Sequence, residues 1–202
     1  MKRKSVILFL IFILGLTYSC SKETKKIPQD ISLESLLPDL GLHGYETKEI
    51  FKANRENLVQ LYKSVAQRFG IDIESIKDRI PIDRISGIYE GRGRRFTITI
   101  QKYRSEKSAK KELNREVKNS KEIQEFLNRQ KSIMELRLKK VRVNGREGYY
   151  QIYGGGPVGE VRRQYETKLF WMDGVYIFEI SSIGEEIWPE EEIIKIAEEI
   201  GY

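Results

Sequence analysis

The sequence predicts an α+β domain, in which an antiparallel sheet of about six strands carries helices on one face. After the first forty residues, apolar residues at helical spacing occur near the start and near the end of the remaining chain. Between them, short apolar or alternating runs bounded by turn residues are typical of strands. Two hairpin signals, Asn144-Gly145 and Asp173-Gly174, favour antiparallel pairing of the strands that they join.

The first half of this domain is predicted to contain a helix, a hairpin and further helix. The first helix begins at Asn54, because apolar residues recur from there at intervals of three and four. A hairpin is expected over residues 84–101, whose second strand alternates apolar and polar residues. Ser105 caps a second helical region, which we expect to break near residues 119–120 and to continue to about Leu127.

The last third is predicted to be a meander of strands closed by a helix. The expected strands lie at residues 136–143, 149–153, 160–172 and 175–180. In the first of them the apolar phase slips at Lys139-Lys140, which predicts a β-bulge. Pro189 opens the closing helix at its first position, and three glutamates follow at the positive end of the helix dipole.

The first nineteen residues have the features of a signal peptide. Three cations follow Met1, an apolar run occupies residues 6–14, and Ser19 is a small residue directly before Cys20. This pattern resembles the bacterial lipobox, which implies cleavage before Cys20 and attachment of a diacylglyceryl group, often with a third acyl chain. The expected organisation is therefore a signal peptide at 1–19, a tether at 20–37 and one domain at 38–202.

Two alternatives to a lipoprotein signal remain open. An ordinary secretory peptide is compatible with Thr17 and Ser19 at the small-residue positions. An uncleaved anchor is the other alternative, although about 12 apolar residues fall short of the roughly 20 that span a bilayer. The lipoprotein interpretation places the domain at the cell membrane or outer membrane, on its extracytoplasmic face, held by the lipidated Cys20.

Cysteine count and charge exclude several classes of function. Cys20 is the only cysteine, so no intrachain disulfide and no cysteine-based zinc site can form. Without residues 1–19, the chain has 33 basic and 30 acidic residues, a net charge of 33 − 30 = +3. This mild balance does not indicate a nucleic-acid partner. The segment 91–95 is expected to be a basic turn; contact with anionic headgroups or glycans is the alternative.

Short segments along the chain resemble a family of uncharacterised secreted bacterial and archaeal proteins. The similar segments are Pro38-Asp39-Leu40, Glu56-Asn57-Leu58, Phe69-Gly70 and Lys107-Ser108-Ala109, and the C-terminal order of strand, Trp171, turn and strand is also similar. The resemblance covers most of the mature chain. It implies a secreted protein, and it supplies no activity, cofactor or partner.

The residues that catalysis commonly needs are scarce. His43 is the only histidine and lies between two glycines before the first helix, where we expect a structural or solvent-facing role. The sequence contains no Gly-x-Ser-x-Gly nucleophile motif. We therefore expect no enzyme, no bound metal and no cofactor. An enzyme that uses a pair of carboxylates is the alternative.

A candidate recognition site lies around the glycine-rich segment Gly154–Gly159. Tyr149 and Tyr153 precede this segment, and Arg162 and Arg163 follow it. Together they combine backbone freedom, aromatic area and cationic donors, which binding surfaces use. The alternatives are a plain hairpin connection and aromatic residues that belong to the core.

These observations predict a lipid-anchored extracytoplasmic lipoprotein that serves as a non-catalytic binding or accessory module of the cell envelope. Its expected partners are the membrane, through Cys20, and an envelope protein or small ligand. A structural or assembly role in the envelope is the alternative, which a long exposed apolar patch or an open sheet edge would favour.

Overall fold

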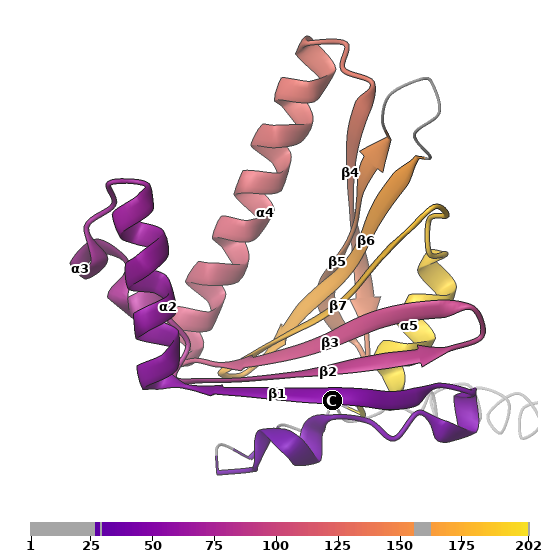
Figure 1. Cartoon of the computed structure of the whole chain (residues 1–202), viewed down its shortest axis with the longest axis horizontal. Coiled ribbons are helices and arrows are strands. Elements are labelled where there is room, and N and C mark those ends of the chain that lie inside the picture. The colour runs from indigo at the N-terminus through magenta and orange to yellow at the C-terminus, as the bar shows by residue number, and fades with distance from the viewer. Residues whose placement is uncertain (1–26, 29, 156–162, 202) are drawn as a thin grey trace, which may run out of the picture.

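A computed structural model describes residues 27–28, 30–155 and 163–201 (Figure 1). Its seven-stranded antiparallel sheet has the spatial order β1-β2-β3-β7-β6-β5-β4. The strands are β1 (Glu46–Asn54), β2 (Asp83–Gly91), β3 (Arg94–Lys102), β4 (Met134–Val143), β5 (Arg146–Gly155), β6 (Gln164–Asp173) and β7 (Tyr176–Gly184). The α+β prediction is therefore confirmed, with seven strands rather than about six.

The helices connect and cover these strands. They are α2 (Arg55–Arg68), α3 (Ile73–Ile76), α4 (Glu106–Arg129) and α5 (Glu190–Glu199), with short 3-10 helices η1 (Leu33–Leu36), η2 (Gly41–His43) and η3 (Lys77–Arg79). The predicted first helix is confirmed, because the Asn54 side chain accepts a hydrogen bond from the Asn57 N–H and so caps α2. Of the helices in the described part, none is both long and apolar enough to cross a bilayer.

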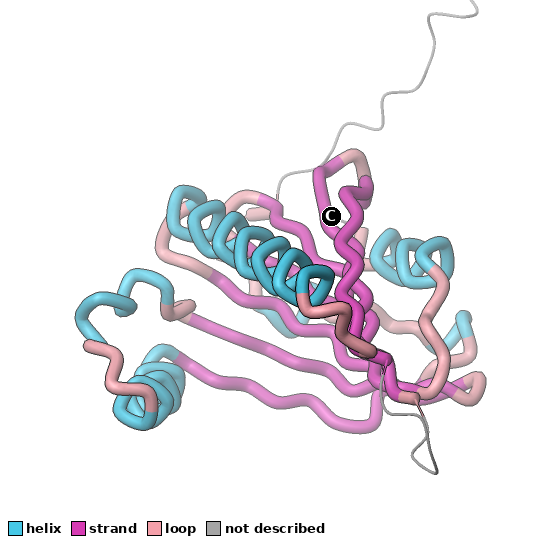
Figure 2. The backbone as a smooth tube through the Cα atoms, turned by 90° about the horizontal axis from the view of Figure 1, so that it is seen from above, coloured by secondary structure: helices cyan, strands magenta, loops and turns pink. Residues whose placement is uncertain are grey.

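Both faces of the sheet carry helices, so the prediction of helices on one face is wrong. On one face, which we call the α4 face, Ala109, Leu113 and Val117 of α4 pack on Phe170 and Ile177. The opposite face, which we call the α5 face, packs against α5 and residues 27–45 (Figures 1 and 2). The physical reason is that the central strands bury consecutive residues, such as Leu169, Phe170 and Trp171, which point alternately to the two faces.

Strand β1 was not predicted because it lacks a buried face. Eight of its nine residues are exposed and one is intermediate, so no apolar alternation marks it in the sequence. It forms an edge of the sheet and pairs only with β2, with a register shift between Thr47 and Glu49.

Residues 27–28 and 30–37 belong to the domain, so the tether prediction is wrong for this part of 20–37. Ile27, Leu33 and Leu36 are buried in the core on the α5 face. The Tyr176 hydroxyl also donates a hydrogen bond to the Pro28 carbonyl oxygen at 3.1 Å. The apolar residues scattered through this polar segment fill the sheet face that α5 leaves free.

Helix α4 continues through the position at which a break was expected. Ser120 is buried on the stripe of α4 that faces the sheet, and its hydroxyl donates a hydrogen bond to the Gln151 side-chain oxygen on β5 at 2.7 Å. Asn119 is exposed. A tertiary hydrogen bond therefore accommodates the polar residue that suggested a helix end.

The bulge expected at Lys139-Lys140 is also absent, because β4 and β5 pair in continuous register. Leu136 lies on the α4 face and is buried there, whereas Val141 and Val143 belong to the core on the α5 face. The apolar residues change from one face of β4 to the other because the strand is covered on the α4 face near Leu136 and on the α5 face near Val141 and Val143. The predicted Asn144-Gly145 turn is confirmed, with φ of 48° and 79° at its two residues.

Candidate functional site

The structure describes three of the four residues of the recognition site that the sequence suggested. Tyr149 stacks on Phe170 with ring centroids 5.6 Å apart, and its hydroxyl donates to Glu147 at 2.5 Å. Burial and then Glu147 raise the pKa of Tyr149 to about 12. Tyr153 is partly buried on the same sheet face and Arg163 is exposed. Tyr149 thus belongs to the packing beneath α4; Arg162 and residues 156–159 lie outside the described residues.

The first two glycines of that segment have a structural role in the sheet. Gly154 has φ of 159°, and a Cβ atom there would lie 2.4 Å from the Gln164 carbonyl oxygen. At Gly155, with φ of 104°, a Cβ atom would lie 2.5 Å from the Ile133 carbonyl oxygen. Close approach of neighbouring backbones therefore explains these two glycines without a ligand.

The predicted basic turn at 91–95 is confirmed as the connection between β2 and β3. Arg92 and Gly93 both have positive φ, 50° and 74°. The Arg94 guanidinium lies over the Trp188 ring at 5.0 Å, and Arg92 lies over Tyr45 at 5.9 Å. These arginines stack on aromatic residues of the core, which accounts for their presence at the turn.

His43 lies at the end of η2, on the surface. Its Nε2 atom is 3.3 Å from a carboxylate oxygen of Glu199 on α5, and both side chains are partly exposed. Among residues 27–28, 30–155 and 163–201, no group of three or more histidine, cysteine or acidic side chains is placed to hold a metal ion. The absence of metal and catalysis stays a prediction.

A groove on the α4 face is a stronger candidate for a binding site. It has a volume of about 370 Å³ and lies between the first turns of α2 and the strands β1, β2 and β3. The residues that line it are Phe51, Lys52, Ala53, Leu58, Leu61, Arg84, Ser86, Ile88 and Thr97; we call it the α2 groove. Helix α4 packs against β4, β6 and β7, so it covers the other half of this face (Figure 1).

The apolar side of α2 is covered only in part. Leu58 and Ala66 are 1% and 2% exposed, whereas Leu61, Val65 and Phe69 are 53%, 48% and 69% exposed. Phe51 on the adjoining edge strand is 54% exposed. Large exposed apolar residues that gather at one place mark interaction surfaces more often than single ones do.

The sequence contained a signal for this groove, but the signal was ambiguous. Apolar residues at intervals of three and four along α2 predict an apolar helix side, and such a side usually packs against the core. Periodicity alone does not tell what covers that side. The exposed edge strand β1, which forms the opposite wall, was not predicted at all.

Polar and charged contacts separate the α2 groove from the region beneath α4. Ser86 and Thr99 are hydrogen-bonded across β2 and β3 at 2.9 Å. Lys168 on β6 forms ion pairs of 3.3 Å with Glu116 of α4 and with Glu179 of β7. Burial alone would lower the pKa of Lys168, but these carboxylates outweigh it and raise the pKa.

A second ionic cluster lies where α2 and α4 approach each other. Glu112 of α4 pairs with Arg115 on the same helix and with Arg79 of η3 at 3.5 Å. Burial, followed by the charge of Glu112, raises the pKa of Tyr62 on α2. This cluster joins α4 to η3, while Leu61, Val65 and Phe69 of the neighbouring segment stay exposed.

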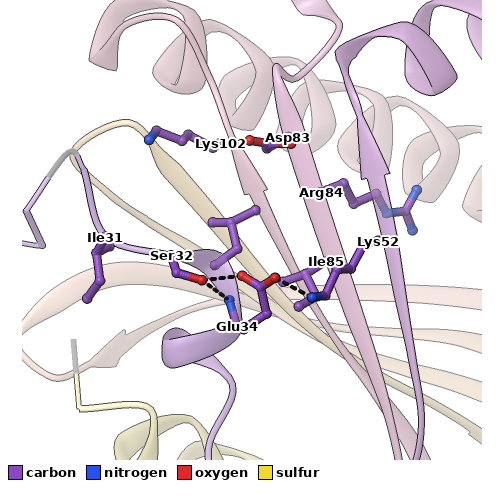
Figure 3. Close-up of a pocket in the computed structure, with 9 residues that line it drawn as sticks. Ile31, Ser32, Glu34, Lys52, Asp83, Arg84, Ile85 and Lys102 are labelled. Carbon is purple, nitrogen blue, oxygen red and sulfur yellow. Dashed lines mark hydrogen bonds and ion pairs between the residues drawn. The ribbon is translucent and has the colours of Figure 1, made fainter.

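A smaller cavity of about 190 Å³ lies on the opposite side of the β1–β2 edge (Figure 3). Glu34 lies between Ser32 and Lys52, and it contacts both. The Lys52 hydrogen bond, followed by that of Ser32, lowers the pKa of Glu34 from its usual 4.5 to about 2. Because these polar groups satisfy one another, we interpret the cavity as the site where residues 31–34 dock on the sheet.

Comparison with known proteins supports the fold alone. No family model and no curated protein matches the sequence. Among solved structures, the chain is similar to the extracellular domain of PknH from Mycobacterium tuberculosis, with a TM-score of 0.52 and 8% identity. The match covers 88% of this chain and 96% of that domain. The arrangement of helices and strands is therefore shared with a known extracellular domain.

Proposed function

We propose that this chain is an extracytoplasmic lipoprotein, anchored through Cys20, whose domain is a non-catalytic binding module. The α2 groove is its binding surface, and an envelope protein or small ligand is its partner. The observation that carries the proposal is the exposure of Phe51 and Leu61. Folding leaves these apolar side chains in water, so their burial by a partner would be favourable.

The composition of the groove supports binding rather than reaction. Its lining includes the apolar residues Phe51 on β1 and Leu58 and Leu61 on α2. The charged residues in its lining are Lys52 and Arg84, both cationic. An apolar surface with a few polar groups at its edge is typical of ligand and partner sites.

Cross-linking in intact cells tests the groove. The photoreactive residue p-benzoylphenylalanine at position 51 should give a discrete adduct, whereas the same residue at position 42, where Leu42 is 99% exposed, should give none. The mass of the adduct distinguishes a protein from a small ligand. The absence of an adduct at position 51, or equal adducts at both positions, would contradict the proposal.

The lipid anchor has a separate test. Replacing Cys20 with Ala should move the full chain from the membrane fraction to the soluble extracytoplasmic fraction, because two or three acyl chains are needed for stable attachment. Mass spectrometry of the N-terminal peptide should show Cys20 as the acylated first residue. A soluble wild-type chain with an unmodified N-terminus would refute the anchor and leave the groove to be judged by cross-linking.

The edge strand β1 favours an assembly role as the second candidate function. This strand spans nine residues, and its outer edge has no strand partner within the described chain. Exposed edges of this length can pair with another chain. A cross-linked adduct with the mass of a second copy of this chain would favour assembly over ligand binding.

A further inference from the structure

Ile27, the first residue that the structure describes, lies at the end of the sheet that carries the β6–β7 turn and the start of α4. Ile27 lines a surface hollow of about 430 Å³ together with Arg104, Ser105, Asp173 and Gly174, which lie beside the start of α4 and the β6–β7 turn. The hydrogen bond from Tyr176 to Pro28 fixes the next residues at the same place. We call this part of the molecule the anchor end.

The anchor end must lie close to the membrane if Cys20 is lipidated, as proposed above. The seven residue steps from Cys20 to Ile27 can span at most roughly 25 Å. The anchor end therefore stays within reach of the headgroups, and the tether alone does not fix the tilt of the domain.

Cations are concentrated at this end. Between positions 104 and 111, the chain has four basic residues, Arg104, Lys107, Lys110 and Lys111, and one acidic residue. All four basic side chains are exposed, and the structure gives none of them an ion pair within the described residues. Elsewhere on α4, by contrast, Arg115 and Lys118 pair with glutamates.

One further cation belongs to this region. Burial, followed by repulsion from Arg104, lowers the pKa of Arg55 on α2. Arg55 is held there by hydrogen bonds to the carbonyl oxygens of Ile80, at 2.5 Å, and Lys77, at 3.0 Å. Like charges gathered on one surface are favourable when an anionic partner covers them.

We propose that the anchor end is a contact surface for anionic phospholipid headgroups, in which Arg104, Lys107, Lys110 and Lys111 orient the lipid-anchored domain on the bilayer. Each cation near an anionic membrane contributes roughly fivefold to membrane affinity. The α2 groove adjoins this end at Ala53 and Arg84 and extends from it along β2 and β3 to Ile88 and Thr97.

The orientation can be measured on the lipidated full chain in vesicles. Because acylation consumes the thiol of the only native cysteine, Asn114→Cys and Asn128→Cys each supply a unique labelling site on α4. The two positions are exposed and lie about 21 Å apart along the helix. Fluorescence quenching by a nitroxide on the lipid headgroups reports which position is nearer the bilayer.

In vesicles of phosphatidylglycerol and phosphatidylcholine, the label at position 114 should be quenched about twofold or more relative to position 128. Pure phosphatidylcholine, or about 0.5 M salt, should remove this difference because the attraction is electrostatic. The variant Lys107→Gln, Lys110→Gln, Lys111→Gln should remove it too. The control Lys118→Gln, Lys121→Gln, Arg129→Gln, with the same charge change farther along α4, should retain it.

Equal quenching at both positions in anionic vesicles would overturn the proposal. A difference that persists in pure phosphatidylcholine and in the Lys107, Lys110, Lys111 variant would also overturn it, since the tether alone would then set the orientation. The mass of the N-terminal peptide is measured first. An unacylated Cys20 refutes the anchor itself, and this orientation with it, and is thereby distinguished from a failure of the headgroup contact alone.

Discussion

The two halves of the sheet differ in how their α4 face is covered. Beneath α4, β6 and β7 bury Phe170 and Ile177, and the ion pairs of Lys168 join helix to sheet. At β1 and β2, the same face carries the α2 groove, and Phe51 is exposed. Folding explains the apolar residues beneath α4, whereas it does not explain the exposed apolar residues Phe51 and Leu61 of the α2 groove.

This difference separates stability from function within one sheet. Buried side chains beneath α4, such as Phe170, should contribute more to the free energy of unfolding than the exposed side chains of the α2 groove. Phe51 and Leu61 should contribute little, because unfolding changes their exposure less. Substitutions in the two halves therefore provide a direct test of the comparison.

The largest effect is expected beneath α4. Phe170→Ala should lower the free energy of unfolding by about 3–5 kcal/mol, because it removes a ring that is 2% exposed and leaves a cavity. Phe69→Ala, where the ring is 69% exposed, should change it by less than about 0.5 kcal/mol. Urea denaturation measures both values; similar losses in the two variants would break the comparison.

The next effect concerns the ion pairs beneath α4. Lys168→Met should lower the free energy of unfolding by about 1–3 kcal/mol at neutral pH, between the values for exposed and buried pairs, since Glu116 and Glu179 are partly exposed. Because the pKa of Lys168 is raised on folding, its contribution is present below the unfolded value of about 10.4 and is lost as pH rises through the folded value.

The difference between wild type and Lys168→Met should therefore shrink above about pH 10.4 and stay constant between pH 6 and 9. Denaturation at a series of pH values measures it. A difference that grows in alkaline solution would contradict the role of these ion pairs.

A smaller effect is expected at the hydrogen bond inside α4. Ser120→Ala leaves the buried Gln151 side-chain oxygen without its donor and should lower the free energy of unfolding by about 1 kcal/mol or somewhat more. Asn119→Ala, at the adjacent exposed position, is the matched control and should be neutral within about 0.5 kcal/mol. If the two variants are equally stable, the hydrogen bond does not support the unbroken helix.

The smallest effect concerns the docking of residues 31–34 on β1. The pKa of Glu34 is lowered to about 2, so its contribution is present above the usual value of 4.5 and is lost as pH falls toward 2. Glu34→Gln should slightly lower the melting temperature at pH 6 and have no effect near pH 2. An effect of equal size at both pH values would show that the charge of Glu34 is not involved.

The sequence predicted the elements that follow from local patterns. The cap at Asn54 and the turn at Asn144-Gly145 are decided by a few neighbouring residues, and both predictions were confirmed. The helix break predicted near Ser120 was wrong because the hydrogen-bond partner of Ser120, Gln151, is distant in the sequence. No local pattern reveals such a hydrogen bond. The predicted boundary between tether and domain was wrong for a similar reason, since Ile27 and Leu36 pack on strands that are distant in the sequence.

The candidate site was less predictable than the fold. The glycine-rich segment was the reason for predicting a site at Tyr149 and Tyr153. In the structure, Tyr149 packs on Phe170, and close backbone contacts explain Gly154. The α2 groove depends on what α4 leaves uncovered, and that is a property of the assembled sheet. Its signal in the sequence, the apolar side of α2, is identical to that of a core helix.

The central claim is that the exposed apolar residues of the α2 groove, Phe51 and Leu61, serve binding and not folding. The most direct test measures the stability and the dye binding of the double variant Phe51→Thr, Leu61→Gln. Threonine is favourable in a strand and glutamine in a helix, so neither substitution disturbs its element. We expect the free energy of unfolding to change by less than about 1 kcal/mol, because both side chains are more than half exposed. Binding of the apolar dye 8-anilinonaphthalene-1-sulfonate to the folded domain should fall severalfold. A loss of about 3 kcal/mol or more, or unchanged dye binding, would contradict the claim.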